Sequence, residues 1–547
     1  VFVEGTDFLD TGARLVLWNS ELEKVDEPDQ SAGWFAGSMD ETYRTMERID
    51  PIVSGNNVEN WKTNESIRYD VRSYCGQVYG SPGQDNDHNW YLNDIADNYI
   101  FNASSTLVLS SEHSPYIFGH DVTVPENYTV SIDPGVTLLG VDKNSSFIVE
   151  GLIDAKGDEN NRIVFTSIHD INNDVESQPG DWQNIIIKNS GVFEGSFVDF
   201  FYGGNTYRYD SCTTCGANQV IRNEGGNINL KNILFENIFI DEEIGNDDAY
   251  VWSSGGELIL YDSIFSGGQR GLVTQSNVDI SAVGLTFLGF SSSTYPVELG
   301  NSMPVVWKDN TFTSNTLNMA RISVTELEED YTIENGSNFL FTNLNVSLST
   351  TLTIKPGARL YLSSYGMLNV YGSLDVVGMI DNPVYITSPG RFGGIYFSSA
   401  TGNLSHVNIS NGGSFRNRST FPMHSMSSAM VWSKNSEVLF DSCSIMESRR
   451  PGDTVRIEGG NTVFRDCILG WKNPYDKTYL SWEDNGIWTK YSTLHLDNVT
   501  FKRMNYAVQM YKDYQFTYEN MRHSNFENMF YSLNAKKWFP SDLFSSL

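Results

Sequence analysis

The sequence is poor in basic residues, in cysteine and in long apolar runs. Its 547 residues include 36 Lys and Arg against 68 Asp and Glu, which gives a formal net charge of -32. Such a chain repels nucleic acid and anionic lipid, so we expect neither as a partner. No run of 18 or more apolar residues occurs, which predicts no membrane insertion.

A helical periodicity is also missing, whereas short alternating runs are frequent. Examples are Ile228-x-Leu230, Leu258-x-Leu260, Val278-x-Ile280 and Leu494-x-Leu496. Strict alternation is typical of strands with one buried face, and the Gly, Asn, Asp and Ser between the runs are typical of tight turns. The sequence therefore predicts an all-β protein.

The strongest signal is an internal duplication. Residues 129–167 align with residues 351–388 with a single one-residue gap, matching Pro134-Gly135 to Pro356-Gly357 and Gly151 to Gly372. The correspondence continues downstream in the same order, for example from Gly203-Gly204 to Gly412-Gly413. We interpret this as a tandem duplication with a unit of about 200 residues.

Within each copy the alternating runs recur at an irregular spacing of about 20–32 residues. Strands this short bury a face only when successive coils stack on one another. We therefore predict a right-handed parallel β-helix, with an N-terminal β-rich cap domain over 1–120, a first repeat over 121–335 and a second repeat with a C-terminal cap over 336–547. Both ends are read either as simple caps or as edges that add a strand to the next subunit.

Three short patterns carry a family resemblance. They are Ile132-x-Pro134-Gly135-Val136-x-Leu138, the glycine-flanked strands that end at Gly151 and Gly372, and Ile163-x-Phe165-Thr166-Ser167. Over about residues 120–530 the chain resembles the pectin-lyase-like superfold, as in bacterial and archaeal cell-surface proteins. The resemblance implies the fold; lyases, hydrolases, adhesins and inert scaffolds all share it.

The five cysteines allow several states. Cys443 and Cys467 hold matching places in consecutive coils, so they form either a disulfide or a stacked pair of reduced thiols. Cys212 and Cys215 lie in a polar loop and are candidates for a loop-closing disulfide. Cys75 is left unpaired.

Asn-x-Ser/Thr sequons favour an exported, extracellular glycoprotein. They occur at Asn64, Asn102, Asn127, Asn144, Asn335, Asn345, Asn403, Asn408, Asn417 and Asn498. For each of them the alternative is an ordinary polar turn.

Two polar segments are candidate binding sites. Asp85, Asp87 and Asn89 offer oxygen ligands at alternate positions, as calcium loops do, so calcium is the one cofactor considered; a plain polar turn is the alternative. The second segment is an acidic cluster whose counterpart in the other copy contains arginines, so the pair are either solvated loops or contacts between molecules. Its members are Asp241, Glu242, Glu243, Asp247 and Asp248 against Glu447, Arg449, Arg450 and Asp453.

Enzyme signatures such as H-E-x-x-H or G-x-S-x-G are not found, and the eight histidines are scattered. We therefore predict a non-catalytic structural or adhesive surface glycoprotein that self-associates into a filament, sheath or surface layer. The alternative is a polysaccharide-active enzyme, a lyase or hydrolase, or a carbohydrate-binding β-helix protein.

Overall fold

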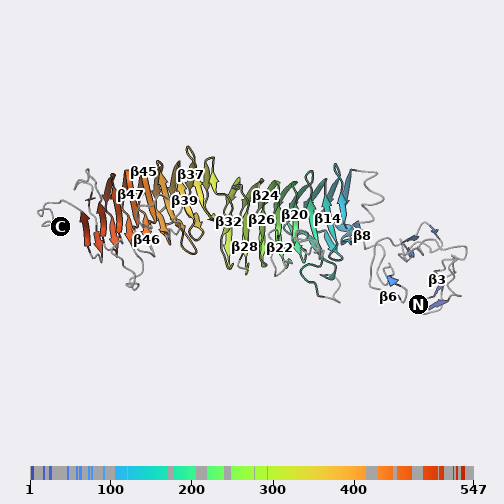
Figure 1. The fold of residues 1–547 in the computed structure, drawn as a ribbon. Coiled ribbons are helices and arrows are strands. Elements are labelled where there is room, and N and C mark those ends of the chain that lie inside the picture. Colours follow the sequence, from blue (N-terminus) through green and yellow to red (C-terminus); the bar gives the residue numbers. More distant parts are fainter. Residues whose placement is uncertain are drawn as a thin grey trace. The chain divides into compact units, whose positions relative to one another are not determined.

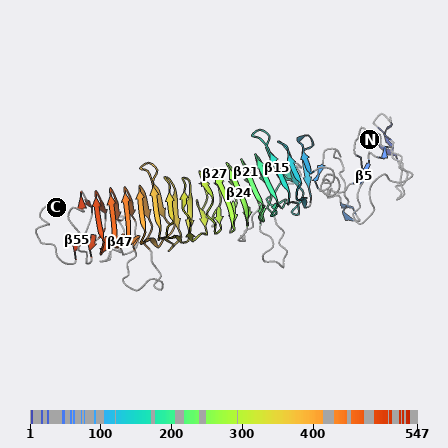
Figure 2. The ribbon, with the colours of Figure 1, turned by 90° about the horizontal axis from the view of Figure 1, so that it is seen from above.

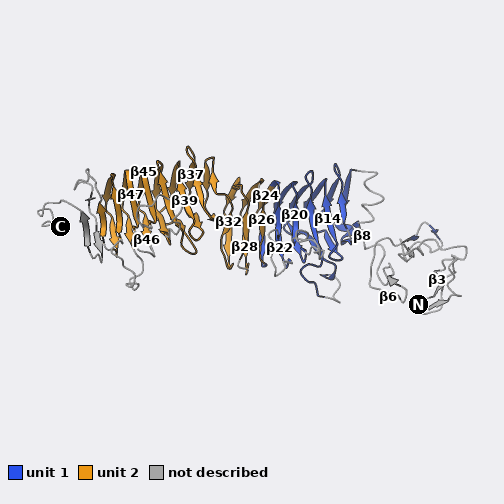
Figure 3. Cartoon of the chain, viewed as in Figure 1, with its two compact units in different colours: residues 1–257, 263–268 blue, residues 258–262, 269–547 orange. Residues whose placement is uncertain are grey.

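A computed structural model gives the fold of the chain (Figure 1). It divides into two compact units, unit 1 with residues 1–257 and 263–268 and unit 2 with residues 258–262 and 269–547 (Figure 3). Besides a few short segments before residue 93 and after residue 520, the structure describes residues 105–119, 121–170, 176–204, 218–238, 248–275, 277–291, 294–413, 429–446, 453–470, 485–502, 504 and 506–510.

The N-terminal segment of unit 1 contains short antiparallel strands. Three strands form one sheet and two further pairs stand apart from it. These strands are β1 (Phe2–Glu4), β2 (Val16–Trp18), β3 (Lys24–Asp26), β4 (Met46–Arg48), β5 (Trp61–Thr63), β6 (Arg72–Ser73) and β7 (Gly76–Gln77).

The rest of unit 1 is a parallel β-helix with three sheets, and each coil contributes one strand to each sheet. The first sheet contains β8 (Trp90–Tyr91), β10 (Tyr116–Phe118), β13 (Thr137–Gly140), β16 (Ile163–Ser167), β19 (Val198–Phe201), β22 (Leu234–Glu236) and β25 (Ile264–Ser266). The second contains β11 (Val122–Val124), β14 (Ser146–Val149), β17 (Asn184–Ile187), β20 (Gln219–Asn223) and β23 (Ala249–Ser253). The third contains β9 (Thr106–Leu109), β12 (Thr129–Ile132), β15 (Leu152–Lys156), β18 (Val192–Ser196) and β21 (Asn227–Lys231). The parallel ladder thus includes β8 and β9, which precede residue 121.

Unit 2 has the same parallel stacking, and one of its sheets runs through the whole unit. This sheet contains β26 (Leu272–Thr274), β29 (Val297–Leu299), β32 (Ala320–Ile322), β35 (Asn338–Phe341), β38 (Arg359–Leu362), β41 (Val384–Thr387), β44 (Val407–Ser410), β46 (Ser444–Met446), β48 (Ile468–Gly470), β51 (Thr500–Lys502) and β54 (Asn525–Glu527). Beside it, β27 (Val278–Val283) pairs with β30 (Val306–Lys308), and β28 (Thr286–Leu288) pairs with β31 (Thr311–Thr313).

Two further columns of strands begin after β31 and form the remaining faces of unit 2. One column contains β33 (Glu326–Leu327), β36 (Leu344–Val346), β39 (Met367–Val370) and β42 (Gly394–Ser398), and the other β34 (Tyr331–Ile333), β37 (Thr351–Ile354), β40 (Ser373–Val377) and β43 (Thr401–Ser405). The 11-residue strands β45 (Val431–Asp441) and β47 (Val455–Arg465) span both columns. After them come β49 (Asn485–Lys490), β50 (Thr493–Asp497), β52 (Tyr506–Met510), β53 (Met521–Arg522) and β55 (Tyr531–Ala535). The predicted all-β parallel β-helix is confirmed, and the view from above shows the same stacked arrows (Figure 2).

The interior of each unit is filled by ladders of apolar side chains. In unit 1 the rings of Phe165, Phe200, Phe235 and Phe265 stack in that order, with centroid distances of 5.2, 5.0 and 4.9 Å. In unit 2 Phe440 and Phe464 stack at 4.8 Å. These rings are fully buried, so the alternating apolar residues provide the hydrophobic stabilisation of the coils.

The residues that mark the duplication occupy tight corners in both units. Gly135 and Gly357 have φ values of +83° and +80°, which fits the second central position of a turn after proline. A Cβ on Gly151 would lie 2.3 Å from the carbonyl oxygens of Pro125 and Tyr128, and a Cβ on Gly372 would meet the neighbouring coil in the same way, at 2.2 Å from the Thr350 oxygen. The repeated glycines are therefore required by the close approach of successive coils.

Among the described residues, none of the helices combines the length and the apolar character that crossing a bilayer requires.

Candidate functional site

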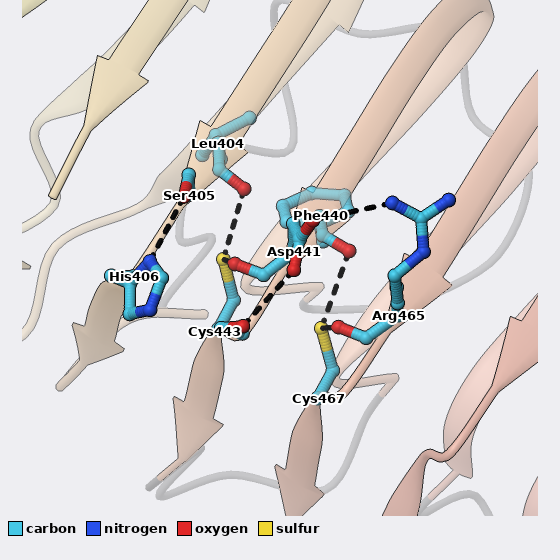
Figure 4. A network of polar contacts seen from close by, with 9 residues as sticks. Leu404, Ser405, His406, Phe440, Asp441, Cys443, Arg465 and Cys467 are labelled. Atoms are coloured by element: carbon cyan, nitrogen blue, oxygen red, sulfur yellow. Dashed lines mark hydrogen bonds and ion pairs between the residues drawn. The ribbon is translucent and has the colours of Figure 1, made fainter. Parts of the chain in front are cut away.

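Cys443 and Cys467 lie at equivalent corners of two successive coils of unit 2 (Figure 4). Cys443 follows β45 and Cys467 follows β47, and the Ile468 amide donates to the Cys443 carbonyl oxygen. Both side chains are buried. Of the two states that the sequence allows, the structure has the reduced one: both residues are free thiols, and both donate to main-chain carbonyl oxygens.

Each thiol makes the same pair of hydrogen bonds. The Sγ of Cys443 donates to the Leu404 oxygen at 3.2 Å, in the preceding coil, and to the Asp441 oxygen at 3.3 Å. The Sγ of Cys467 donates to the Phe440 oxygen at 3.4 Å and to the Arg465 oxygen at 3.1 Å. The contact with the Cys467 thiol and then burial raise the pKa of Cys443, so this sulfur stays protonated and is a poor nucleophile.

The polar residues around these thiols are engaged elsewhere. His406 Nδ1 pairs with the Ser405 hydroxyl at 3.0 Å, and the Asp441 carboxylate accepts hydrogen bonds from Ser442 at 3.0 Å and from Arg465 at 3.3 Å (Figure 4). The thiols point instead to carbonyl oxygens. The cluster therefore has the composition of a cysteine–histidine–aspartate site but not its hydrogen bonding.

We expect iodoacetamide to label neither Cys443 nor Cys467 in the folded protein, because both side chains are buried and the reagent cannot reach them. In denaturant without a reductant, both are expected to react fully, as mapped by mass spectrometry of tryptic peptides. A pair that stays unlabelled after unfolding would instead be a disulfide and would contradict the thiol assignment.

A stack of aromatic rings and a guanidinium follows one outer face of unit 2. Tyr396, Trp432, Arg456 and Trp488 occupy register-matched positions on β42, β45, β47 and β49. The Arg456 guanidinium lies 5.5 Å from the ring centroid of Trp432 and 4.1 Å from that of Trp488. Its Nε donates to Glu458 Oε1 at 2.6 Å, so the cation is held by two rings and a carboxylate.

The buried carboxylate of Asp453 borders this stack. Asp453 Oδ1 accepts a hydrogen bond of 2.7 Å from the Asn485 amide, which also donates to Gln509 at 2.9 Å. Asp453 Oδ2 lies 3.9 Å from Arg456 Nη1. Asp453 was predicted as part of a solvated or intermolecular loop cluster, but its side chain is 4% exposed and serves contacts inside the unit.

Unit 1 contains the same arrangement. Arg222 on β20 stacks on its register partner Trp252 on β23 at 4.7 Å, and its Nε donates to Glu224 Oε1 at 2.7 Å. Lys188 adds a salt bridge of 2.7 Å to Glu224. Although partial burial of Glu224 acts in the opposite direction, the hydrogen bonds from Lys188 and Arg222 lower its pKa.

The Glu224 interactions predict a loss of stability in acid. Because the pKa of Glu224 is lower in the folded state than its ordinary value of 4.5, its contribution is present above about pH 4.5 and disappears as the pH falls through the folded-state pKa. We expect the unfolding midpoint of the wild type to fall between pH 5 and pH 3 more steeply than that of E224Q. Parallel curves for the two proteins in urea titrations would contradict this.

The stacking residues were missed in the sequence, although a signal was present. Ile221-Arg222-x-Glu224-Gly225-Gly226 recurs as Val455-Arg456-x-Glu458-Gly459-Gly460, and each is followed by a Trp one coil later. In the duplication alignment Arg222 corresponds to Trp432, so the motif recurs one coil further along in the second copy. The repeated Arg-x-Glu-Gly-Gly motif is therefore not visible in the alignment of the two copies.

Several predicted site residues lie outside the described residues. These are Cys75, Asp85, Asp87, Asn89, Cys212, Cys215, Asp241, Glu242, Glu243, Asp247, Glu447, Arg449 and Arg450, with the sequons Asn64, Asn102 and Asn417. Asp248 is described and is fully buried, and its Oδ1 accepts a hydrogen bond of 2.8 Å from the main-chain N–H of Asn218. Within the described segments, no group of three or more His, Cys, Asp or Glu side chains is arranged to hold a metal ion.

Seven sequons lie in the described part of the chain. Five of the asparagines are exposed, and two lie within strands and are partly buried. The exposed ones are Asn127, Asn144, Asn335, Asn403 and Asn498, and the partly buried ones are Asn345 and Asn408.

Comparisons with known proteins add little about the site. No protein-family model matches the chain, and no curated protein matches it. Among solved structures, the chain is similar to one described as the crystal structure of the Agl-KA catalytic domain, with 13% sequence identity and a TM-score of 0.16. The match covers 84% of this chain and 71% of that one. A similarity this low carries no argument about function, which has to come from the chain's own residues.

Proposed function

We propose that this chain is a non-catalytic structural or adhesive glycoprotein of the cell exterior, a subunit of a filament, sheath or surface layer. The observation that supports it most is the mutual pairing of outward polar side chains on successive coils. In unit 2 the Asn369 amide donates to Asn345 at 2.8 Å, the Ser373 and Thr401 hydroxyls pair at 2.7 Å, and those of Thr286 and Thr311 at 3.1 Å. Polar side chains that are hydrogen-bonded to one another make the surface of the coils more rigid. They are also not free to transfer protons to a substrate.

Three of the arginines also connect successive coils. Arg222, Arg359 and Arg456 each stack on the aromatic ring at the matching position of the following coil, at 4.7, 4.4 and 4.1 Å. These cations stabilise neighbouring coils. The excess of acidic residues then keeps subunits soluble before assembly.

Electron microscopy of the native material, together with an activity assay on the purified protein, tests this proposal. We expect polymers or sheets with a regular repeat, and no depolymerisation of acidic polysaccharides. Single particles that cleave such a polysaccharide would contradict it and would favour the enzymatic alternative. An assembly that dissolves on chelation would assign calcium a place at the contacts between subunits.

One observation favours carbohydrate binding as a second candidate. Trp432 and Trp488 are partly exposed beside Arg456, and aromatic edges next to charged groups are common in recognition surfaces. Affinity electrophoresis against acidic and neutral polysaccharides tests it with the W432A/W488A variant. Retardation that is lost in this variant but kept in Y385A, which removes a stacked ring from another face of unit 2, would support binding at the stack. Equal mobility with and without polysaccharide would exclude it for the glycans used.

A further inference from the structure

The seven described sequons differ in how accessible their asparagine amide and their hydroxyl group are in the folded chain. Transfer of a glycan needs the asparagine amide and the hydroxyl two residues later to be reached together. An exposed asparagine is therefore insufficient when that hydroxyl is buried or bound to another group.

In five of the seven described sequons the hydroxyl is already engaged. For Asn144 the hydroxyl belongs to Ser146, which is buried and donates to Asp121, and for Asn335 it belongs to Ser337, which is fully buried and donates to the Trp307 oxygen at 3.4 Å. In the other three the hydroxyl is hydrogen-bonded to a side chain of its own coil or of a neighbouring coil. For Asn345 this hydroxyl is Ser347, which pairs with Glu326 at 2.6 Å. For Asn403 it is Ser405, paired with His406 at 3.0 Å, and for Asn408 it is Ser410, paired with Thr387 at 2.9 Å.

The two remaining sequons differ from these in a common way. Asn127 in unit 1 and Asn498 in unit 2 are exposed, and both sit in turns with positive φ, 68° and 51°. Their hydroxyls belong to Thr129 and Thr500, the first residues of β12 and β51, which face outward and are partly exposed. The turn therefore presents the amide while the strand start presents the hydroxyl beside it.

We propose that Asn127 and Asn498 are the glycan acceptors of the folded chain among its described sequons. This rests on the proposed function as an exported glycoprotein. The Asn498 Nδ2 donates to Asp466 Oδ1 at 2.5 Å, and this contact is compatible with a glycan because a glycosylated amide keeps one N–H. Both asparagines are exposed, so a glycan attached to either one extends into solvent.

Two measurements with the full chain test the inference. The unglycosylated folded protein is incubated with a purified oligosaccharyltransferase that accepts Asn-x-Ser/Thr and with its lipid-linked oligosaccharide, and site occupancy is mapped by glycopeptide mass spectrometry. We expect modification at Asn127 and Asn498 and background levels at the other five sites, with N127Q and N498Q each losing one glycan. The same protein unfolded in mild denaturant, or cut into peptides, is expected to be modified at all seven.

The outcomes separate this inference from the proposed function. The inference would be overturned if Asn144 or Asn335, whose hydroxyl partners Ser146 and Ser337 are buried, were modified in the folded chain as fully as Asn127 and Asn498. It would also be overturned if neither Asn127 nor Asn498 were modified. Native material that carries no glycan, although the folded chain is modified at the two sites in vitro, would contradict the proposed exported glycoprotein and leave the site assignment standing. The E326A variant, which frees the Ser347 hydroxyl, is expected to raise occupancy at Asn345; an unchanged occupancy there would contradict the role assigned to the hydroxyl.

Discussion

Replacement of Trp182 by alanine is expected to lower the free energy of unfolding of unit 1 by about 3–5 kcal/mol. Trp182 is fully buried, and its Nε1 donates to the Phe201 oxygen at 2.7 Å. Its ring contacts Phe118 and Phe165 at centroid distances of 5.9 and 6.4 Å. Removing the indole leaves a cavity that the surrounding strands cannot close, because they are fixed by their pairing to neighbouring coils.

Urea unfolding followed by far-ultraviolet circular dichroism measures this loss, and hydrogen exchange of β14, β16 and β17 localises it to unit 1. W182F is the matched control, because it keeps most of the apolar volume and removes the hydrogen bond to Phe201. We expect it to cost about 1–3 kcal/mol, less than the alanine variant. A W182A protein as stable as W182F would show that the cavity collapses and would contradict the packing argument.

The parts of the fold that were predictable are those specified by local backbone demands. Gly135 and Gly357 need positive φ after proline, and Gly151 and Gly372 need space for the preceding coil, so both kinds of position keep their residue in each copy. Alternation of apolar residues then identifies the buried faces. These signals are readable from a single chain because each depends on a few consecutive residues.

The candidate site was less predictable because its contacts depend on register between coils of unequal length. Arg222 meets Trp252 after 30 residues, Arg456 meets Trp488 after 32 and Arg359 meets Tyr385 after 26. Because these separations differ, a search of the sequence with one fixed repeat length does not identify the partners. The cysteine pair shows the same limit, since matching positions in consecutive coils were recognised from the sequence, whereas the choice between thiols and a disulfide was not decided there.

Removing the charge of Arg162 is the second change for which a large effect is expected. Arg162 Nε donates to Asp199 Oδ2 at 2.7 Å, and its Nη2 donates to Asp199 Oδ1 at 2.5 Å and to the Asn232 oxygen at 2.7 Å. It thereby joins three successive coils of unit 1 at the starts of β16, β19 and β22. The Asp199 side chain is only 10% exposed, so R162M leaves a poorly hydrated carboxylate without its partner.

We expect R162M to destabilise unit 1 by about 2–3 kcal/mol, below the ~3–5 kcal/mol of a fully buried pair because the arginine side chain is 30% exposed. The R162M/D199N double variant should recover part of this loss, since it removes the isolated charge, and urea unfolding of the single and double variants gives the coupling between the two residues. A cost of R162M under about 0.5 kcal/mol would place the pair among ordinary surface salt bridges. In that case the bidentate contact would align the coils without holding them together, and the stability of unit 1 would rest on its buried aromatic ladder.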